Sequence, residues 1–197
     1  MKILLITINY QDVRSTEELI KSIQDCERVD EVKIIIGDNK SKLETKRDLN
    51  KIKNNSNLNI DLTFFDQNHF YWPAANKIIL EKIKKKKKLP EWTIICNNDT
   101  KIRNKNFFKE LLKINNNEFC VIGPKIINQK KENLNPFMID PMSRLQRIYW
   151  NLYFSSFYFS GILNFLRNIK SFKKTRSHPD LKKEVYAVHG SMMIFSK

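Results

Sequence analysis

Two aspartates stand where a parallel sheet would bring acidic groups together. Asp38 and Asp99 each follow a short apolar run, 32–36 and 92–96, and both have asparagines beside them. In an open sheet of parallel strands, ligands bind outside the carboxyl ends of the strands, so polar residues at these positions are candidates for ligand binding. An acid at a strand end also serves as the cap of the following helix, and both roles are open for Asp99.

Polar residues follow or precede other elements at the same expected edge. Thr7, Asn9 and Tyr10 come at the end of the first apolar run, and the polar segment 68–76 leads into a helical stretch. Because parallel strands end on one side of a sheet, we expect these groups to lie beside the two aspartates. The candidate edge residues are Thr7, Asn9, Tyr10, Gly37, Asp38, Asn39, Ser41, Asn68, Asn76, Asn97, Asn98, Asp99 and Thr100.

Short β-branched runs alternate with polar stretches of helical period over the first 127 residues. This is the pattern of βα units around a mostly parallel sheet, so we predict an α/β fold. The predicted strands cover 2–8, 32–36, 60–65, 92–96 and 119–122, and the predicted helices cover 15–25, 43–53, 73–84 and 107–114. Ser15 and Glu18 have the spacing of a capping box, and Pro73 fits the first turn of its helix.

The chain divides by composition into three parts. Residues 1–127 form the predicted α/β core, and 128–184 hold a loop and an aromatic, basic helical insertion. Residues 185–197 are predicted to form the last strand of the core. A length of 197 residues suffices for one sizeable hydrophobic core. With 41% hydrophobic and 29% charged residues, the composition excludes disordered and fibrous proteins.

Glycine and cysteine usage excludes several common functions. The four glycines are all far apart, so the Gly-rich phosphate loops of P-loop NTPases and dinucleotide-binding domains are absent. The three cysteines are widely spaced and match neither a zinc site nor a disulfide framework. The first apolar run is too short for the core of a signal peptide, because the polar residues 9–12 follow it directly. We therefore expect a cytoplasmic protein.

Six segments, in order along the chain, resemble the glycosyltransferase family 2 proteins of the GT-A fold, including rhamnosyltransferase-like enzymes of bacterial polysaccharide assembly. They are ITINYQ, IIIGDNKS, NHFYWPAAN, IICNNDT, VIGPKI and VHGSMMIFSK. The second is similar to the family's VVDNxS, the third to its NxGYxxAxN, and the fourth to the LNNDT form of its metal-binding DxD motif. The last is similar to the family's GxxMLIRR strand near the acceptor site. The resemblance implies a Rossmann-like GT-A sheet.

The same resemblance implies inverting transfer of a hexosyl or rhamnosyl group from a UDP- or dTDP-sugar to a polysaccharide or lipid-linked glycan. Mg²⁺ or Mn²⁺ would neutralise the leaving diphosphate, with Asp99 as the implied ligand. Asp38 matches the family acid that accepts a hydrogen bond from the nucleobase. The other implied donor-binding residues are Thr7, Asn9, Tyr10, Asn39, Asn68, Asn76, Asn97 and Asn98, and those on the acceptor side are His189, Gly190 and Ser191.

Two features depart from the family pattern. Phe70 stands where the family has glycine, and a bulky residue does not easily take a positive φ. The family's general base lies in a region after the VHGSMMIFSK strand, and the sequence stops at Lys197, so no catalytic base is assigned. The alternatives to an active transferase are a truncated GT-A domain that at most binds nucleotide, and a module that binds a membrane or a protein partner.

The net charge of +15 favours anionic partners. Residues 145–166 are rich in aromatics and long enough to cross a bilayer, but polar residues interrupt them and basic residues follow to 176. A helix on an anionic membrane surface, a helix packed in protein or on a second copy, and a true span all fit this pattern. We expect peripheral contact with the inner face of the cell membrane through 145–176. We expect no nucleic-acid partner, and an apolar last strand that allows homo-oligomers.

Overall fold

The computed structural model describes residues 1–84, 90–169 and 184–197. The chain forms two compact units, and the predicted α/β fold class is confirmed. The first, called here the sheet unit, comprises Met1–Pro124 and Gly190–Lys197, and the second, the hairpin unit, comprises Lys125–His189. The sequence placed the corresponding boundaries at 127 and 184.

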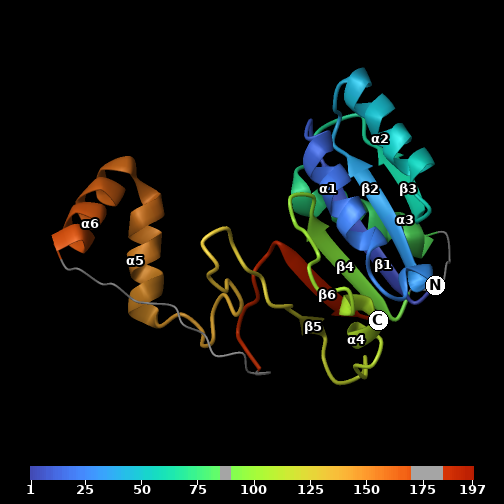
Figure 1. Ribbon diagram of the computed structural model, residues 1–197. Helices are drawn as coiled ribbons and strands as arrows, with labels where there is room; N and C mark the ends of the chain where they lie inside the picture. The colour runs from blue at the N-terminus through green and yellow to red at the C-terminus, as the bar shows by residue number, and fades with distance from the viewer. Residues whose placement is uncertain (85–89, 170–183) are drawn as a thin grey trace. The chain divides into compact units, whose positions relative to one another are not determined.

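The described residues of the sheet unit form a six-stranded sheet in the order β3-β2-β1-β4-β6-β5 (Figure 1). β1 (Ile3–Asn9), β2 (Val32–Asp38), β3 (Asn59–Phe64) and β4 (Trp92–Asn97) are parallel to one another. β6 (Met192–Ser196) runs antiparallel to both β4 and β5 (Val121–Ile122). The register pairs Asn9 with Asp38 and Ile8 with Asn97, so β1, β2 and β4 end together at one edge of the sheet.

Different helices cover the two faces of the sheet. Every residue of β1 is buried, so alternate side chains must pack against protein on both faces. One set packs against α3 (Tyr71–Lys84), in a cluster that includes Leu4, Ile6, Ile8, Ala74, Ala75 and Ile78. The other set faces α1 (Val13–Gln24), whose Thr16 donates a hydrogen bond to Asn9. α2 (Leu43–Asn55) packs beside α1, and the short α4 (Phe107–Leu111) buries its Phe108.

α1 begins two residues earlier than predicted, at Val13. The predicted capping box of Ser15 and Glu18 is wrong, because Asp12 is the N-cap and accepts a hydrogen bond from the Ser15 amide at 3.1 Å. The hydrogen bonds to Ser15 hold the pKa of Asp12 below its usual value. Aspartate caps a helix as well as serine does, so the earlier of the two candidate caps sets the start of the helix.

Gly37 lies in β2 at a point where no larger side chain fits without a rearrangement. A Cβ atom there would come within 2.8 Å of Ile8 Cδ1 and 2.9 Å of Ile78 Cδ1. We expect Gly37→Val to lower the free energy of unfolding by about 2–3 kcal/mol through overpacking, as measured by urea denaturation. Gly190→Val is the matched control, since a Cβ at Gly190 meets nothing within 4 Å. Equal stability of the two variants would contradict the packing described here.

In its described residues, the hairpin unit contains two helices and two isolated β-bridges, Ile127 with Asn133 and Met138 with Ala187. The sequence predicted one helical segment over 145–166, and the structure instead has α5 (Arg144–Ser155) and α6 (Phe157–Ile169). The break comes from Ser156, which is extended at φ −157° and ψ 144° and whose hydroxyl accepts from the Tyr158 amide. Among the described residues, no helix has both the length and the apolar character to cross a membrane.

Candidate functional site

Buried hydrogen bonds join the ends of β1 and β2. Asn9 Nδ2 donates to Asp38 Oδ1 at 3.0 Å, and the Ser41 amide donates to Asp38 Oδ2 at 3.0 Å. The Ser41 hydroxyl accepts from the Gln11 amide at 2.9 Å. Asn9 and Asp38 are both 0% exposed. Both carboxylate oxygens of Asp38 therefore bind the chain itself, and this side chain fixes the two turns relative to each other.

A second branch of hydrogen bonds connects β1 to the turn after β4. Thr16 Oγ1 in α1 donates to Asn9 Oδ1 at 2.9 Å, and Asn98 Nδ2 donates to Thr16 Oγ1 at 3.2 Å. Thr16 is fully buried and was not among the residues that the sequence nominated. The available signal was its spacing from Leu19 and Ile20, which places it on the inward face of the helix.

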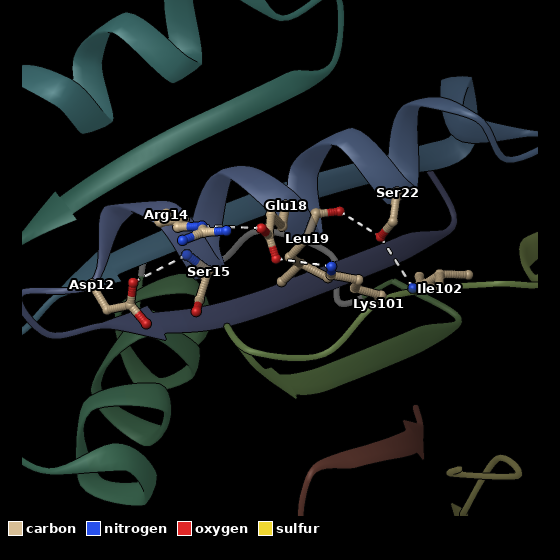
Figure 2. A network of polar contacts seen from close by, with 8 residues as sticks. All are labelled: Asp12, Arg14, Ser15, Glu18, Leu19, Ser22, Lys101 and Ile102. Carbon is tan, nitrogen blue, oxygen red and sulfur yellow. Dashed lines mark hydrogen bonds and ion pairs between the residues drawn. The ribbon is translucent and has the colours of Figure 1, made fainter. Parts of the chain in front are cut away.

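α1 also holds the segment that follows this turn (Figure 2). Lys101 Nζ lies 2.9 Å from Glu18 Oε2, and the Ile102 amide donates to Ser22 Oγ at 3.1 Å. The hydrogen bond from Lys101 lowers the pKa of Glu18, and Arg14 lowers it further. These contacts attach the chain just after Asp99 to the helix that also contacts Asn9, so they restrict the position of the turn.

The segment before α3 is tied to the turn after β2 through Asn39. Asn39 Nδ2 donates to the Phe70 carbonyl at 2.9 Å, and Asn39 Oδ1 accepts from the His69 amide at 3.3 Å. Asn68 Oδ1 accepts from the Phe70 amide at 2.8 Å, whereas Asn76 lies exposed on α3. Asn39 and Asn68 thus shape the backbone of this edge, and four chain segments meet there.

Phe70 takes a left-handed backbone conformation, with φ at 59°. Its side chain is 75% exposed, so little packing offsets the strain of this conformation. We expect Phe70→Gly to be more stable than Phe70→Ala by about 1 kcal/mol, because only glycine takes this conformation without strain. Urea denaturation of the two variants checks this difference. A Phe70→Ala protein as stable as Phe70→Gly would show that the backbone relaxes out of the left-handed region.

The edge has a buried polar layer and an exposed aromatic layer. Thr7, Asn9 and Asp38 are all 0% exposed, whereas the aromatic side chains of Tyr10, Phe70 and Trp72 meet solvent. The buried groups therefore set the shape of the edge, and the aromatic side chains provide surface that a ligand can reach. Aromatic rings of this kind suit flat or apolar ligand faces, including nucleobases.

Asp99 is exposed in the turn after β4, where the Thr100 amide donates to the Asn97 carbonyl at 3.3 Å. The nearby Tyr71 hydroxyl is buried and has no hydrogen-bond partner among the described residues. Burial raises the pKa of Tyr71, with smaller contributions from Cys96 and Asp99. The Tyr71 phenol is therefore a neutral donor at neutral pH. Burial likewise raises the pKa of Cys96 to about 12, so its thiol stays protonated.

The protein donors at this turn fit a metal ion that shares its ligands with a substrate. In the described parts of the chain, no group of three His, Cys, Asp or Glu side chains could hold a metal ion. The turn offers the Asp99 carboxylate and the amide oxygens of Asn97 and Asn98. Mg²⁺ is usually bound by one or two carboxylates together with water and substrate phosphates, so this donor set suits it better than an all-protein cage would.

The residues predicted on the acceptor side fall in both units. The Ser191 carbonyl accepts from the Asn97 amide at 2.8 Å, so Ser191 lies next to the end of β4 in the sheet unit, directly after Gly190. His189 is the last residue of the hairpin unit, where its amide donates to Asn135 Oδ1.

A hollow of about 470 Å³ lies between α1 and α2, away from the strand ends. Its lining includes charges of both signs, such as Glu17 with Lys21 and Asp48 with Lys51, and each pair is joined by an ion pair. These side chains satisfy one another, so we assign the candidate site to the strand ends and not to this hollow.

Comparisons with known proteins identify the fold. The sequence matches no protein-family model and no curated protein. The structure is similar to a mannosyltransferase from Pyrobaculum calidifontis in complex with GDP-Man and Mn²⁺, with a TM-score of 0.50 and 15% identity over 57% of this chain and 31% of that one. It is similar to S. aureus TarS 1-349 in complex with UDP-GlcNAc, with a TM-score of 0.55 and 19% identity over 77% of this chain and 43% of that one. The chain has a GT-A-like fold.

The chain spans less than half the length of these similar structures. Within the GT-A-like fold, the edge built from Asn9, Asp38, Asn39 and Asn98 is the carboxyl end of the parallel strands. This is the position at which open α/β sheets bind ligands.

Proposed function

We propose that this chain is an inverting glycosyltransferase of the family 2 type that uses a nucleoside-diphosphate sugar. The observation that supports this most is the buried network joining the ends of β1, β2 and β4 and the segment before α3 into one edge. That edge occurs in a fold shared with structures that contain GDP-Man or UDP-GlcNAc. A UDP- or dTDP-sugar is the proposed donor, and a hexosyl or rhamnosyl group is the group transferred.

The exposed Tyr10 ring is proposed to stack on the nucleobase. Asp38 and Asn9 are proposed to act through the shape of the turns that carry Tyr10 and Asn39, because both side chains are buried and bonded to the chain. Thr7, fully buried in β1, is proposed to support the same turn. Asn68 and Asn76 are proposed to face the donor from the α3 side.

Asp99 is proposed to hold Mg²⁺ or Mn²⁺ with help from Asn97 and Asn98, and the cation would neutralise the leaving diphosphate. Because the turn has a single carboxylate, we expect weak metal binding without nucleotide and tighter binding when the diphosphate adds its oxygens. The Tyr71 hydroxyl, a neutral donor buried near Asp99, has no hydrogen-bond partner among the described residues.

The proposed acceptor is a growing polysaccharide or a lipid-linked glycan at the cytoplasmic face of the membrane, with His189, Gly190 and Ser191 on the acceptor side. Inverting transfer needs a general base that takes the proton of the acceptor hydroxyl. That role is assigned to no residue of this chain.

Donor consumption tests the proposed function. The protein is incubated separately with UDP-glucose, UDP-GlcNAc, dTDP-rhamnose and GDP-mannose in the presence of Mn²⁺, and release of the nucleoside diphosphate is followed. We expect slow release from a UDP- or dTDP-sugar, and none after the metal is chelated. Absence of release from all four donors, in protein that binds one of their nucleotides, would reduce the function to nucleotide binding without turnover.

A further inference from the structure

α5 and α6 contact each other as a helical hairpin (Figure 1). Asn164 Nδ2 donates to the Tyr153 hydroxyl at 3.2 Å across the hairpin, and the Tyr149 and Tyr153 rings stack with centroids 6.2 Å apart. Among residues 144–165, the partly buried side chains that form the interior of the hairpin are Tyr149, Tyr153, Ser156, Ser160 and Leu163. Four of these five residues have a polar group, so most of the apolar side chains of the hairpin are not buried between its two helices.

Those larger side chains face outward instead. No residue of α5 is buried, and Leu145 and Phe154 are 79% and 77% exposed. On α6, Tyr158, Ile162 and Phe165 are all exposed and share one face of the helix at i, i+4 and i+7. Phe157, beside the break at Ser156, is exposed as well. Exposed apolar side chains that gather on one small element mark an interaction site.

The sequence of this part of the chain carries charge of a single sign. The stretch from 141 to 179 contains no Asp or Glu, and its basic residues are Arg144, Arg147, Arg167, Lys170, Lys173, Lys174 and Arg176. On α5, Arg144, Arg147 and Asn151 follow one another at i, i+3 and i+7, so a basic polar strip runs beside the apolar residues. Elsewhere the chain carries 21 acidic residues, so the absence of acid here is local.

We propose that the α5–α6 hairpin docks on the surface of an anionic lipid bilayer, with its outward aromatic and aliphatic side chains at the boundary between headgroups and acyl chains. Trp150 and Tyr158 suit that boundary because their rings can stay apolar while the N–H or O–H group faces water. The exposed phenylalanine and aliphatic side chains add apolar area that a bilayer can bury. Arginine and lysine near the surface add attraction to anionic headgroups. This inference goes beyond the proposed function and does not require the chain to bind nucleotide.

The charge pattern argues for a bilayer over a second copy of the chain. Two hairpins placed face to face would bring like charges together without a compensating acidic group in 141–179. An anionic lipid surface instead supplies the opposite charge and an apolar layer at once.

Co-sedimentation of the full chain with lipid vesicles tests the proposal. One set of vesicles contains phosphatidylcholine alone, and the other contains about one third phosphatidylglycerol. We expect partitioning to the anionic vesicles at least tenfold above that to the neutral ones. Raising NaCl from about 0.1 M to about 0.5 M should weaken it, because the attraction between charges is screened.

Two variants separate the contributions of charge and apolar surface. Arg144→Gln with Arg147→Gln is expected to lower partitioning by about thirtyfold, from the loss of two charges near the surface. Phe157→Ser with Phe165→Ser is expected to lower it by at least about tenfold. The matched controls are Arg103→Gln with Lys113→Gln, and Leu43→Ser with Leu80→Ser. They remove two positive charges, or replace two apolar side chains by serine, at exposed positions of the sheet unit. We expect both controls to partition within about twofold of the unmodified chain.

Three outcomes would overturn the proposal. The first is equal partitioning to neutral and anionic vesicles, or none to either. The second is an equal loss of partitioning in the control variants, which would show that net charge alone attracts the chain. The third is an absence of vesicle binding together with a dimer that Phe157→Ser with Phe165→Ser converts to monomer in sedimentation velocity, which would assign the surface to a second copy.

Discussion

Asp99→Ala is expected to slow Mn²⁺-dependent release of nucleotide from the sugar donor by about a hundredfold, because it removes the only carboxylate of the turn after β4. The free energy of unfolding should stay within about 0.5 kcal/mol of the original, since Asp99 is exposed. Asp99→Asn should behave like Asp99→Ala in rate, because an amide retains the shape of the side chain but not its charge.

Asp30→Ala is the matched control for this change. Asp30 is exposed at the amino end of β2, opposite the candidate site, and its replacement changes the net charge by the same amount. We expect an unchanged rate in this variant. Equal rates in Asp99→Ala and the unmodified chain would remove Asp99 from the proposed metal site.

Asp38→Asn is expected to lower the free energy of unfolding by about 3 kcal/mol, the largest stability effect that the site predicts. Asp38 accepts hydrogen bonds from Asn9 Nδ2 and from the Ser41 amide, and an amide side chain can accept only one of them while its own N–H₂ group faces the other donor. Both partners are buried, so water cannot replace the lost bond. Urea denaturation measures the change.

A swap of the two side chains tests the same hydrogen bond more sharply. In Asn9→Asp with Asp38→Asn, the amide at position 38 can donate to the carboxylate at position 9 while its oxygen still accepts from Ser41. The carboxylate at position 9 can also accept the bond that Thr16 donates to Asn9. We expect the double variant to recover at least about half of the stability lost in Asp38→Asn. Asp61→Asn, at an ion pair with Lys33 that is partly exposed, should cost less than about 1 kcal/mol.

The parallel part of the sheet could be predicted because local patterns determine it. Buried parallel strands read as continuous apolar runs, as in 32–36, and each is followed by a stretch of helical period. The antiparallel position of β6 between β4 and β5 could not be predicted in the same way. It depends on pairing between residues about 100 positions apart, such as Trp92 with Ser196, and no local spacing reports such a contact.

The break between α5 and α6 was missed for a physical reason. Residues 155–157 contain neither proline nor glycine, and the apolar pattern continues through them. Serine competes for backbone hydrogen bonds, and the Ser156 hydroxyl accepts from the Tyr158 amide, which starts a new helix. Whether a serine hydroxyl makes this hydrogen bond depends on the packing of the two helices. The sequence alone therefore did not predict the break.

Sequence spacing nominated most of the residues that meet at the candidate site but not how each is used. It identified Asn9, Asp38 and Asn98, and it missed Thr16, which hydrogen-bonds to two of them. It also expected Asp38 to contact a ligand directly, whereas this side chain is buried. Whether an acid at a strand end is buried depends on the positions of the neighbouring turns. Tertiary hydrogen bonds set those positions, so local sequence does not predict the burial.

Calorimetric titration of UDP, dTDP, GDP and CDP into the protein tests the central claim most directly, that the strand ends form a metal-assisted nucleotide site. Each titration is made with Mn²⁺ and again with a chelator, and the nucleotide that binds is then titrated into Asp99→Ala. We predict that UDP or dTDP binds in the presence of Mn²⁺ and that chelation or Asp99→Ala weakens this binding by at least about tenfold. Absence of binding by all four nucleotides, in protein that is folded, would contradict the assignment of this edge as a nucleotide-sugar site.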